Sequence, residues 1–471
     1  MSLPACFATA HAAEPALALV TVDKAGFAAW VATQPAPVQA WLAAQDFTGA
    51  SGTQVLVPGA DGHPLFAVAG VADVDDPFAL AHLPRLLPPR LYRLDAASPR
   101  PVPIATAALG WGLGCYRFER YLKACKPFGR LQLDDANHPA LAQTLALLAA
   151  THRVRDLVNT PTEHMGPDEL EAVAADLART HGGTLRTVTG ERLLAENFPA
   201  IHAVGRASHR APRLIELTWG DPAHPRVALV GKGVCFDTGG LNIKTGDGMR
   251  QMKKDMGGAA HAIALAQLVM ARRLPVRLQL LVAAVENAIG PNSYRPGEVI
   301  VTRSGVSVEI DNTDAEGRVI LGDALAYAGE GQPDLLMDFS TLTGAARVAL
   351  GPDLPALFCN DEALAADYLA AGVRTRDPLW RMPLWRPYAH YLKSSIADMA
   401  NGSASRMAGA ISAALYLERF VPDGQRWSHV DGYAWNDFDR PGKPAGGEAQ
   451  GLRAAFALLQ ARYPGAVAAT N

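Results

Sequence analysis

The stretch RVALVGKGVCFDTGG, residues 226–240, decides the fold class of this chain. It begins with a short run of apolar residues and ends in a glycine-rich segment that carries charged side chains. Short apolar runs without alternation are typical of strands that are buried on both faces of a parallel sheet. The polar residues that follow would then lie at the carboxyl end of the strand, where proteins with open α/β sheets bind their ligands.

The same pattern recurs on both sides of this stretch. Three further apolar runs have the length of buried strands: RLIELTW (213–219), LQLLVAAVE (278–286) and DLLMDFSTL (334–342). The intervening segments show helical spacing, as in GGAAHAIALAQLVMARRL (257–274). Strands that alternate with helices in this way predict an α/β domain with a largely parallel central sheet flanked by helices. We assign residues 136–471 to this domain and expect it to carry the chemistry.

Residues 1–135 are predicted to form a second, smaller α/β domain. Apolar runs at 16–22 (ALALVTV) and 53–59 (TQVLVPG) read as strands between turns. No cluster of polar residues in this part of the chain suggests chemistry. We expect a variable domain with a role in oligomerisation or access. Helical spacing at about 138–158 predicts a helix that links the two domains.

Composition and charge limit the classes of protein to which this chain can belong. The chain has 471 residues, of which 49% are hydrophobic and 19% charged, as expected of a globular protein with a large core. Its formal net charge is −3, and no basic run is present, so a nucleic-acid partner is not expected. No stretch reaches the roughly 18 apolar residues that would predict a membrane span.

The cysteines and the N-terminus favour a cytoplasmic location. The five cysteines are scattered and form no CxxC motif, which argues against a disulfide framework and fits a reducing compartment. The first residues, MSLPACFATAHAAEPALALV, lack the basic region of a secretory signal peptide.

The glycine-rich segment at 231–262 brings charged residues together around turns. Glycine lets the backbone approach a ligand closely, so a phosphate-binding loop is one interpretation. However, the GxxxxGK[ST] motif is absent, and Gly231-Lys232-Gly233 lacks the third glycine of a dinucleotide fingerprint. A nucleotide site therefore stays open but is not favoured.

A second charged segment, DNTDAEGRVILGDAL (311–325), suggests a metal site. Asp314 and Glu316 are two residues apart, so in an extended segment their carboxylates point the same way, which is costly unless cations neutralise them. Asp237 and Asp255 also fall in predicted loops or at strand ends. Each acid alone would more often cap a turn or a helix. Together the four could hold two divalent ions, as in many hydrolases, and the absence of HExxH disfavours a histidine-based zinc protease.

Three basic residues accompany these acids. Lys232 follows a buried strand, where a lysine is normally solvated, but beside two cations it would lose its proton and could bind metal as a neutral amine. Lys244 and Arg318 would keep their charge and stabilise developing negative charge. Ordinary surface salt bridges are the alternative for both.

Four motifs resemble those of the leucyl aminopeptidase family, the cytosolic dinuclear metalloaminopeptidases. They are GKGVCFDTGGLNIK (231–244), KKDMGGAA (253–260), NTDAEGR (312–318), which is the signature of that family, and STLTGA (340–345). The resemblance covers roughly residues 150–460. The tail RPGKPAGGEAQGLRA (440–454) is similar to the peptidase B branch of the family.

The resemblance implies a role for each site residue. The tight metal site is implied to consist of Lys232, Asp237, Asp255 and Glu316. The exchangeable site is implied to consist of Asp237, Glu316 and Asp314, the last through its side chain and its backbone carbonyl. Lys244 is similar to the catalytic lysine of the family, and Arg318 to the arginine that holds a bicarbonate as general base. Met252, Thr341, Leu342 and Gly344 align with residues that line the substrate pocket.

The expected function is hydrolysis of the N-terminal residue from peptides or dipeptides by a water that two metal ions activate. A substrate with a free N-terminus would bind through its α-amine, which makes the enzyme an exopeptidase. Mn²⁺ or Zn²⁺ is the expected metal, with Mg²⁺ or Co²⁺ as alternatives, because the ligands combine carboxylates with a nitrogen. The family also implies a homohexamer.

Two other functions are weighed. One is a non-catalytic binding or regulatory protein on the same fold, since fold alone does not determine function. The other is hydrolysis of a phosphate ester at a two-metal site. The complete set of ligands favours the peptidase.

Overall fold

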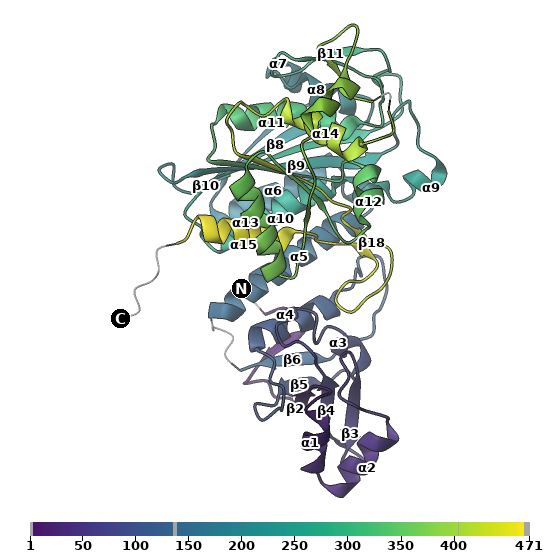
Figure 1. Cartoon of the computed structure of the whole chain (residues 1–471), viewed down its shortest axis with the longest axis vertical. Helices are drawn as coiled ribbons and strands as arrows, with labels where there is room; N and C mark the ends of the chain where they lie inside the picture. Colours follow the sequence, from purple (N-terminus) through teal and green to yellow (C-terminus); the bar gives the residue numbers. More distant parts are fainter. Residues whose placement is uncertain (1–2, 135–138, 404, 466–471) are drawn as a thin grey trace. The chain divides into compact units, whose positions relative to one another are not determined.

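The computed structural model describes residues 3–134, 139–403 and 405–465. These residues form two compact units (Figure 1). The smaller unit comprises the chain up to His152 together with Phe438–Ala445, and the larger unit comprises Arg153–Asp437 together with the chain from Gly446 onward. Within the described residues, no helix combines the length and the apolar character needed to cross a membrane.

The smaller unit is built on a six-stranded sheet. Its strands lie in the order β1 (Phe7–Thr9), β6 (Arg130–Leu133), β5 (Leu91–Leu94), β2 (Leu17–Val22), β4 (Pro64–Gly70) and β3 (Gln54–Pro58). Only the hairpin of β3 and β4 is antiparallel. The unit also contains helices α1 (Phe27–Ala32), α2 (Ala36–Ala44), α3 (Leu83–Leu86) and α4 (Ile104–Cys115). The predicted strands at 16–22 and 53–59 are β2 and β3, so the predicted α/β character of this part is confirmed.

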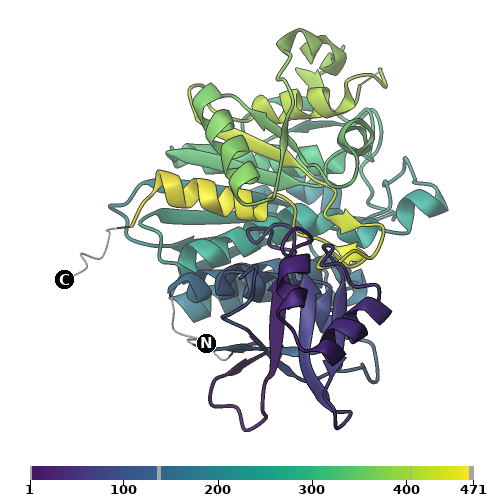
Figure 2. The ribbon, with the colours of Figure 1, turned by 60° about the horizontal axis from the view of Figure 1, so that its bottom comes forward.

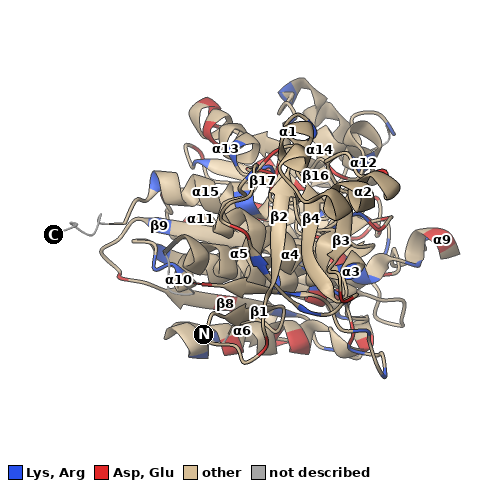
Figure 3. Cartoon of the chain, turned by 90° about the horizontal axis from the view of Figure 1, so that it is seen from below, with Lys and Arg blue, Asp and Glu red and all other residues tan. Residues whose placement is uncertain are grey.

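Burial explains why these strands form. Strands β2 and β4 are tan along their whole length in Figure 3, because neither carries a charged residue. Their apolar side chains pack with Trp111 of α4 and Tyr92 of β5, both fully buried. Aromatic side chains of this size supply much of the hydrophobic stabilisation of a small core.

The larger unit is built on an eight-stranded sheet. Its strands lie in the order β15 (Trp380–Arg381), β14 (Ala356–Cys359), β17 (Trp427–Asp431), β13 (Leu335–Ser340), β9 (Arg226–Asp237), β10 (Arg277–Asn287), β8 (Arg213–Trp219) and β7 (Thr184–Thr189). The four central strands, β17, β13, β9 and β10, are parallel. The predicted largely parallel sheet is therefore confirmed.

Antiparallel pairs lie on both sides of these four strands, and β15 at one edge pairs parallel with β14. β8 pairs antiparallel with β10 and β7, and β14 pairs antiparallel with β17. The almost continuously apolar residues of β8 predict a strand of the parallel group, and its antiparallel pairing corrects this prediction. Such a run reports burial on both faces of the sheet and carries no information about strand direction.

Helices cover both faces of this sheet (Figure 1). One face carries α8 (Pro199–Gly205), α11 (Glu316–Glu330) and α14 (Gly409–Glu418). The other face carries α6 (Pro167–His181), α10 (Gly257–Ala271), α13 (Glu362–Arg374) and α15 (Leu452–Arg462). Figure 2 shows the yellow α15 alongside the green α13. The helix expected at about 138–158 is α5 (Pro139–Asn159).

Shorter elements complete the larger unit. Its short helices are α7 (Arg192–Ala195), α9 (Gly246–Met249) and α12 (Gly344–Leu350), with 3₁₀ turns η1 (Thr162–His164), η2 (Met252–Met256) and η3 (Arg386–Leu392). Two small sheets consist of β11 (Val299–Val301), β12 (Ser307–Glu309) and β16 (Met399–Ala400), and of β18 (Trp435–Asn436) and β19 (Gly446–Gly447).

Close contact between α10 and the central strands positions the segment before this helix. A Cβ atom at Gly258 would lie 2.1 Å from the backbone oxygen of Phe339 in β13. Only glycine allows the first turn of α10 to approach the strand this closely. As a result η2, which directly precedes α10, lies against the end of β9.

Candidate metal centre

A cavity of about 560 Å³ opens in the larger unit beyond the carboxyl ends of β9 and β13. Every residue that the sequence singled out lines this cavity: Lys232, Asp237, Lys244, Met252, Asp255, Asp314, Glu316, Arg318, Thr341, Leu342 and Gly344. Segments more than 100 residues apart in the chain thus meet in one place, as expected for the carboxyl edge of a parallel sheet.

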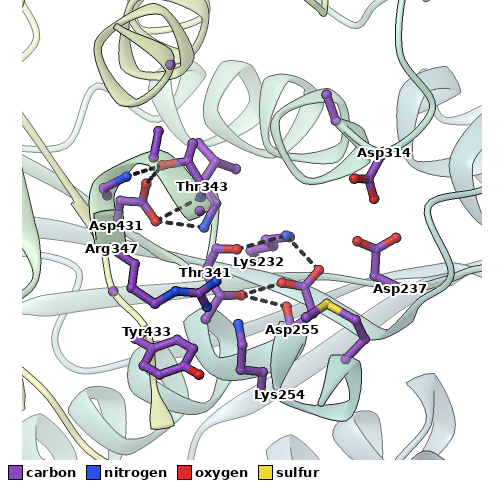
Figure 4. Close-up of a pocket in the computed structure, with 18 of the residues that line it drawn as sticks. Lys232, Asp237, Lys254, Asp255, Asp314, Thr341, Thr343, Arg347, Asp431 and Tyr433 are labelled. Carbon is purple, nitrogen blue, oxygen red and sulfur yellow. Dashed lines mark hydrogen bonds and ion pairs between the residues drawn. The ribbon is translucent and has the colours of Figure 1, made fainter. Parts of the chain in front are cut away.

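Three buried carboxylates form the centre of the site. Asp237 ends β9, Asp255 lies in η2 and Glu316 begins α11. One oxygen from each of them lies within 4.8 Å of the others. Asp314, in the loop before α11, lies beside Asp237 with 32% of its side chain exposed (Figure 4). Oxygen atoms this close from several buried acids fit the ligand set of divalent cations.

Lys232 lies among these acids. Its Nζ is 2.7 Å from Oδ2 of Asp255, 3.1 Å from Oε1 of Glu316, and donates a hydrogen bond to the backbone oxygen of Thr341 at 3.2 Å (Figure 4). Burial by itself would lower the pKa of Lys232, but the neighbouring carboxylates, Asp255 first among them, outweigh burial and raise it. This lysine is therefore not the solvated residue that its sequence position alone would suggest.

Lys244 occupies the other side of the site. Its Nζ lies 2.8 Å from Oδ2 of Asp237 and also forms an ion pair with Asp314. Burial would lower the pKa of Lys244, and the charges of Asp237 and Asp314 raise it. Because both ion pairs lie inside the cavity, an ordinary surface salt bridge does not describe them.

The acids repel one another despite the two lysines. Burial, and after it the charge of Asp237, raises the pKa of Glu316 to about 8 and that of Asp314 to about 6. Carboxyl groups with raised pKa values are costly to ionise, and additional positive charge would relieve that cost. The site residues therefore fit bound metal cations.

Gly317 provides the space that Lys232 needs. A Cβ atom at position 317 would lie 2.3 Å from Cε and 2.7 Å from Nζ of Lys232. Any larger residue between Glu316 and Arg318 would push the lysine out of its position. The side chain of Lys232 in the neighbouring strand β9 thus explains why the NTDAEGR segment has a glycine at position 317.

Arg318 lies in the first turn of α11 and lines the cavity. Its Nη1 donates a hydrogen bond to the backbone oxygen of Asn401 at 2.9 Å. Its Nε is buried and has no hydrogen-bond partner among residues 3–134, 139–403 and 405–465. Burial lowers the pKa of this guanidinium. An unpaired buried N–H of a cation is a potential contact for an anion.

Two buried residues that orient the acids were missed in the sequence. Asn287, the last residue of β10, donates to Oδ1 of Asp237 at 2.8 Å and to the backbone oxygen of Thr313 at 3.0 Å. The hydroxyl of Tyr294 donates to the same backbone oxygen at 2.6 Å. Asn287 directly follows the predicted strand at 278–286, so its place at a strand end was a usable signal.

Asp431 holds the loop after β13 in place. Its carboxylate accepts hydrogen bonds from the backbone N–H of Leu342 at 2.8 Å and of Thr343 at 3.2 Å, and from the hydroxyl of Thr343 at 2.6 Å (Figure 4). The hydroxyl of Thr341 donates to Oδ1 of Asp255 at 2.8 Å. The loop is thereby fixed against both β17 and η2.

An acidic cavity at the carboxyl edge of an α/β sheet is typical of hydrolytic enzymes that use metal ions. Residues 152–456 match the catalytic domain of the cytosol aminopeptidase family, and residues 17–134 match the N-terminal domain of the M17 aminopeptidases. The chain therefore belongs to the cytosol aminopeptidase family and is a hydrolase, an aminopeptidase. The resemblance to leucyl aminopeptidases found in the sequence is confirmed.

Individual relatives agree with this assignment. A probable cytosol aminopeptidase from Syntrophotalea carbinolica is 41% identical over 373 residues, which are 74% of this chain and 73% of the relative. The crystal structure of the cytosol aminopeptidase from Coxiella burnetii is similar with a TM-score of 0.93 and 47% identity, over 97% of this chain and 99% of that one. The bottromycin maturation enzyme BotP, in complex with Mn, is similar with a TM-score of 0.86 and 33% identity, over 96% and 100%.

Proposed function

We propose that this aminopeptidase removes the N-terminal residue from peptides or dipeptides with the help of two divalent metal ions. The observation that carries this proposal is the convergence of the carboxylates of Asp237, Asp255 and Glu316 within 4.8 Å. Mn²⁺ or Zn²⁺ suits a set of carboxylates with one amine, and Mg²⁺ or Co²⁺ would serve as alternatives. The complex of the related BotP with Mn supports a metal of this kind.

The ligands are assigned as in the family that the chain resembles. Lys232, Asp237, Asp255 and Glu316 would hold one ion. Asp237, Glu316 and both the side chain and the backbone carbonyl of Asp314 would hold the other. Positive charge in the site would drive the proton off Lys232, which is then free to bind as a neutral amine. When bound, the ions supply Lewis acidity and make a water nucleophilic near neutral pH.

The remaining residues act on the substrate. Lys244 keeps its proton and stabilises the negative charge that develops on the scissile carbonyl oxygen. Arg318 would hold a bicarbonate that takes up a proton and passes it to the leaving amine. The buried Nε of Arg318 supports an anion at this position. Met252, Thr341, Leu342 and Gly344 would surround the N-terminal side chain of a substrate whose α-amine is free.

We further propose that residues 136–471 form the catalytic domain and that residues 1–135 serve assembly or access. The enzyme is proposed to act in the cytoplasm as a homohexamer, with no membrane or nucleic-acid partner.

Hydrolysis of leucine amide and N-acetyl-leucine amide tests the function. Metal-stripped protein should be inactive, and added Mn²⁺ should restore cleavage of the substrate with a free amine only. Glu316→Ala should abolish this activity, because it removes a ligand of both ions. If folded, metal-loaded protein cleaves neither substrate, the alternative of a non-catalytic binding protein is favoured. Cleavage of a phosphate ester but of no aminoacyl amide would instead select phosphate hydrolysis.

A further inference from the structure

A buried pair of oppositely charged side chains joins β13 to β17. Nδ1 of His429 is 2.6 Å from Oδ1 of Asp338, and Oδ2 of Asp338 accepts a hydrogen bond from the ring N–H of Trp427 at 2.7 Å. All three side chains are fully buried. Neither member of the charged pair lines the cavity, so the proposed mechanism does not use them.

The imidazole ring of His429 is held firmly in place. It stacks on Phe358, with 5.7 Å between the ring centres, and on Trp427, with 6.0 Å between the ring centres. Its Nε2 is buried and has no hydrogen-bond partner in the part of the chain that the structure describes. One nitrogen of the ring is therefore bound to an acid, and the other forms no hydrogen bond that would explain why a polar ring lies here.

The surroundings of His429 favour its charged form. Burial by itself would lower the pKa of His429, but the charge of Asp338 and the hydrogen bond to it outweigh burial and raise the pKa. Asp431, on the same strand, acts in the same direction as Asp338, and Arg318 on α11 acts against them. A raised pKa keeps a histidine ring protonated nearer to neutral pH.

The charge of His429 acts on Asp431. The two residues are two positions apart in β17, so their side chains leave the same face of the strand about 7 Å apart. Burial raises the pKa of Asp431, and the charge of His429 is the largest influence that opposes this rise. Asp431 accepts hydrogen bonds from Leu342 and Thr343, and such bonds are stronger when the acceptor is ionised (Figure 4).

We propose that His429 is a positioning residue of this enzyme: held by Asp338, it supplies the buried positive charge that keeps Asp431 bonded to the loop at residues 341–343. His429 itself contacts neither substrate nor metal and acts through Asp431. The inference rests on the proposed function in one respect, because that function places this loop against the substrate. The alternative is that the charged pair only fastens β13 to β17.

Two substitutions remove the charge and keep the hydrogen bonds. His429→Asn leaves an N–H close to the position of Nδ1, and Asp338→Asn has the size of the acid and can donate to a neutral ring while it accepts from Trp427. Hydrogen–deuterium exchange at the amides of Leu342 and Thr343 should become about 10-fold faster in both variants, as when a charge-assisted hydrogen bond becomes a neutral one. Exchange in β9 and α10 should stay the same.

Kinetics with leucine amide give a second measurement. Each variant should raise KM about 10-fold and keep kcat within about threefold of the wild-type value, because the loop is loosened and the metal ligands are kept. His202→Asn is the matched control. His202 is a buried histidine of α8 whose Nε2 is 3.1 Å from Oε1 of Glu191, and it does not line the cavity. This variant should change neither KM nor the exchange of the loop.

A double-mutant cycle tests whether His429 acts through Asp431. In an Asp431→Asn background there is no carboxylate charge to support, so adding His429→Asn should change KM by less than about twofold. Independent effects of the two substitutions on KM would contradict the proposal and favour the purely structural role.

Unchanged loop exchange and KM in the two charge-removing variants would overturn the proposal. If His429→Asn does not fold, Asp338→Asn decides by the same measurements, and failure of both to fold would mean that the pair is structural. If the folded wild-type protein with added Mn²⁺ cleaves no amide, the proposed function fails. The exchange of the loop still decides this inference in that case, because it needs no substrate.

Discussion

At the scale of single residues, Gly317 offers a direct test of how tightly the site is packed. Gly317→Ala would place a methyl group 2.3 Å from Cε of Lys232, so the lysine must leave its position between Asp255 and Glu316. We expect the free energy of unfolding to fall by about 1–3 kcal/mol, as for other overpacked sites, and Mn²⁺-dependent activity to be lost. Denaturant unfolding and the rate with leucine amide measure the two effects.

The control is Gly322→Ala on the same helix. Its nearest neighbours would be ring atoms of Phe420 at 3.3 Å, which is tight but not a clash. If both variants behave like the wild-type protein, the position of Lys232 does not depend on the glycine.

A substitution at Asn287 tests whether a residue that does not contact the substrate affects the affinity of the metal site. Asn287→Ala removes the hydrogen bond to Oδ1 of Asp237, which holds this proposed ligand in its orientation. Loss of such a partner typically weakens metal binding about 10- to 100-fold, and we expect a decrease of that size in Mn²⁺ affinity by calorimetry. Asn360→Ala, which removes hydrogen bonds near β17 instead, should leave the affinity unchanged. Equal affinities in all three proteins would contradict this role.

At the scale of secondary-structure elements, His261 couples α10 to the segment before α15. Its Nδ1 is 2.7 Å from the backbone oxygen of Gly257, and its Nε2 accepts the backbone N–H of Gln450 at 2.9 Å. Only the neutral ring can donate at one nitrogen and accept at the other. Burial lowers the pKa of His261 below its usual 6.5, although Asp377 and Glu448 act in the opposite direction.

The sign of the pH dependence follows from this shift. Below pH 6.5 the unfolded chain binds a proton at His261, whereas the folded protein does not. The contribution of this residue to the free energy of unfolding is therefore complete above pH 6.5 and decreases as the pH falls toward the lowered pKa. Comparison of unfolding free energies between pH 7.5 and 5.5 should show a smaller decrease for His261→Gln than for the wild-type protein. Identical pH profiles would mean that His261 is not held neutral.

The sequence predicts those helices and strands that a pattern of neighbouring residues identifies. β8, β9, β10 and β13 are predominantly apolar runs, and the charged residues in and after β9 stand out in the sequence. β11, β12 and β16 are two or three residues long, too short for any periodicity to show. The direction of β8 and the role of Asp431 depend on contacts between segments far apart in the chain, which a single sequence does not reveal. Asn287 differs from them, because its position directly after an apolar run is a local signal.

At the scale of the whole molecule, exposed aromatic residues support the proposed assembly. Trp380 and Trp385 follow α13 and are 59% and 55% exposed, and Ile396 is 61% exposed. Large apolar side chains in water are typical of surfaces that contact another protein, and a second copy of the chain would cover them in a homo-oligomer. We expect sedimentation velocity to show a particle of about 300 kDa, six copies of the 49.9 kDa chain.

The variant Trp385→Glu tests which surface is responsible. A charge in an apolar contact is costly to bury, so this change should shift the protein toward smaller species at micromolar concentration. The circular dichroism of the variant should stay the same, because Trp385 is more than half exposed within one chain. A wild-type protein that sediments as a stable monomer would contradict the hexamer, whereas a hexamer that tolerates Trp385→Glu would place the contacts on another surface.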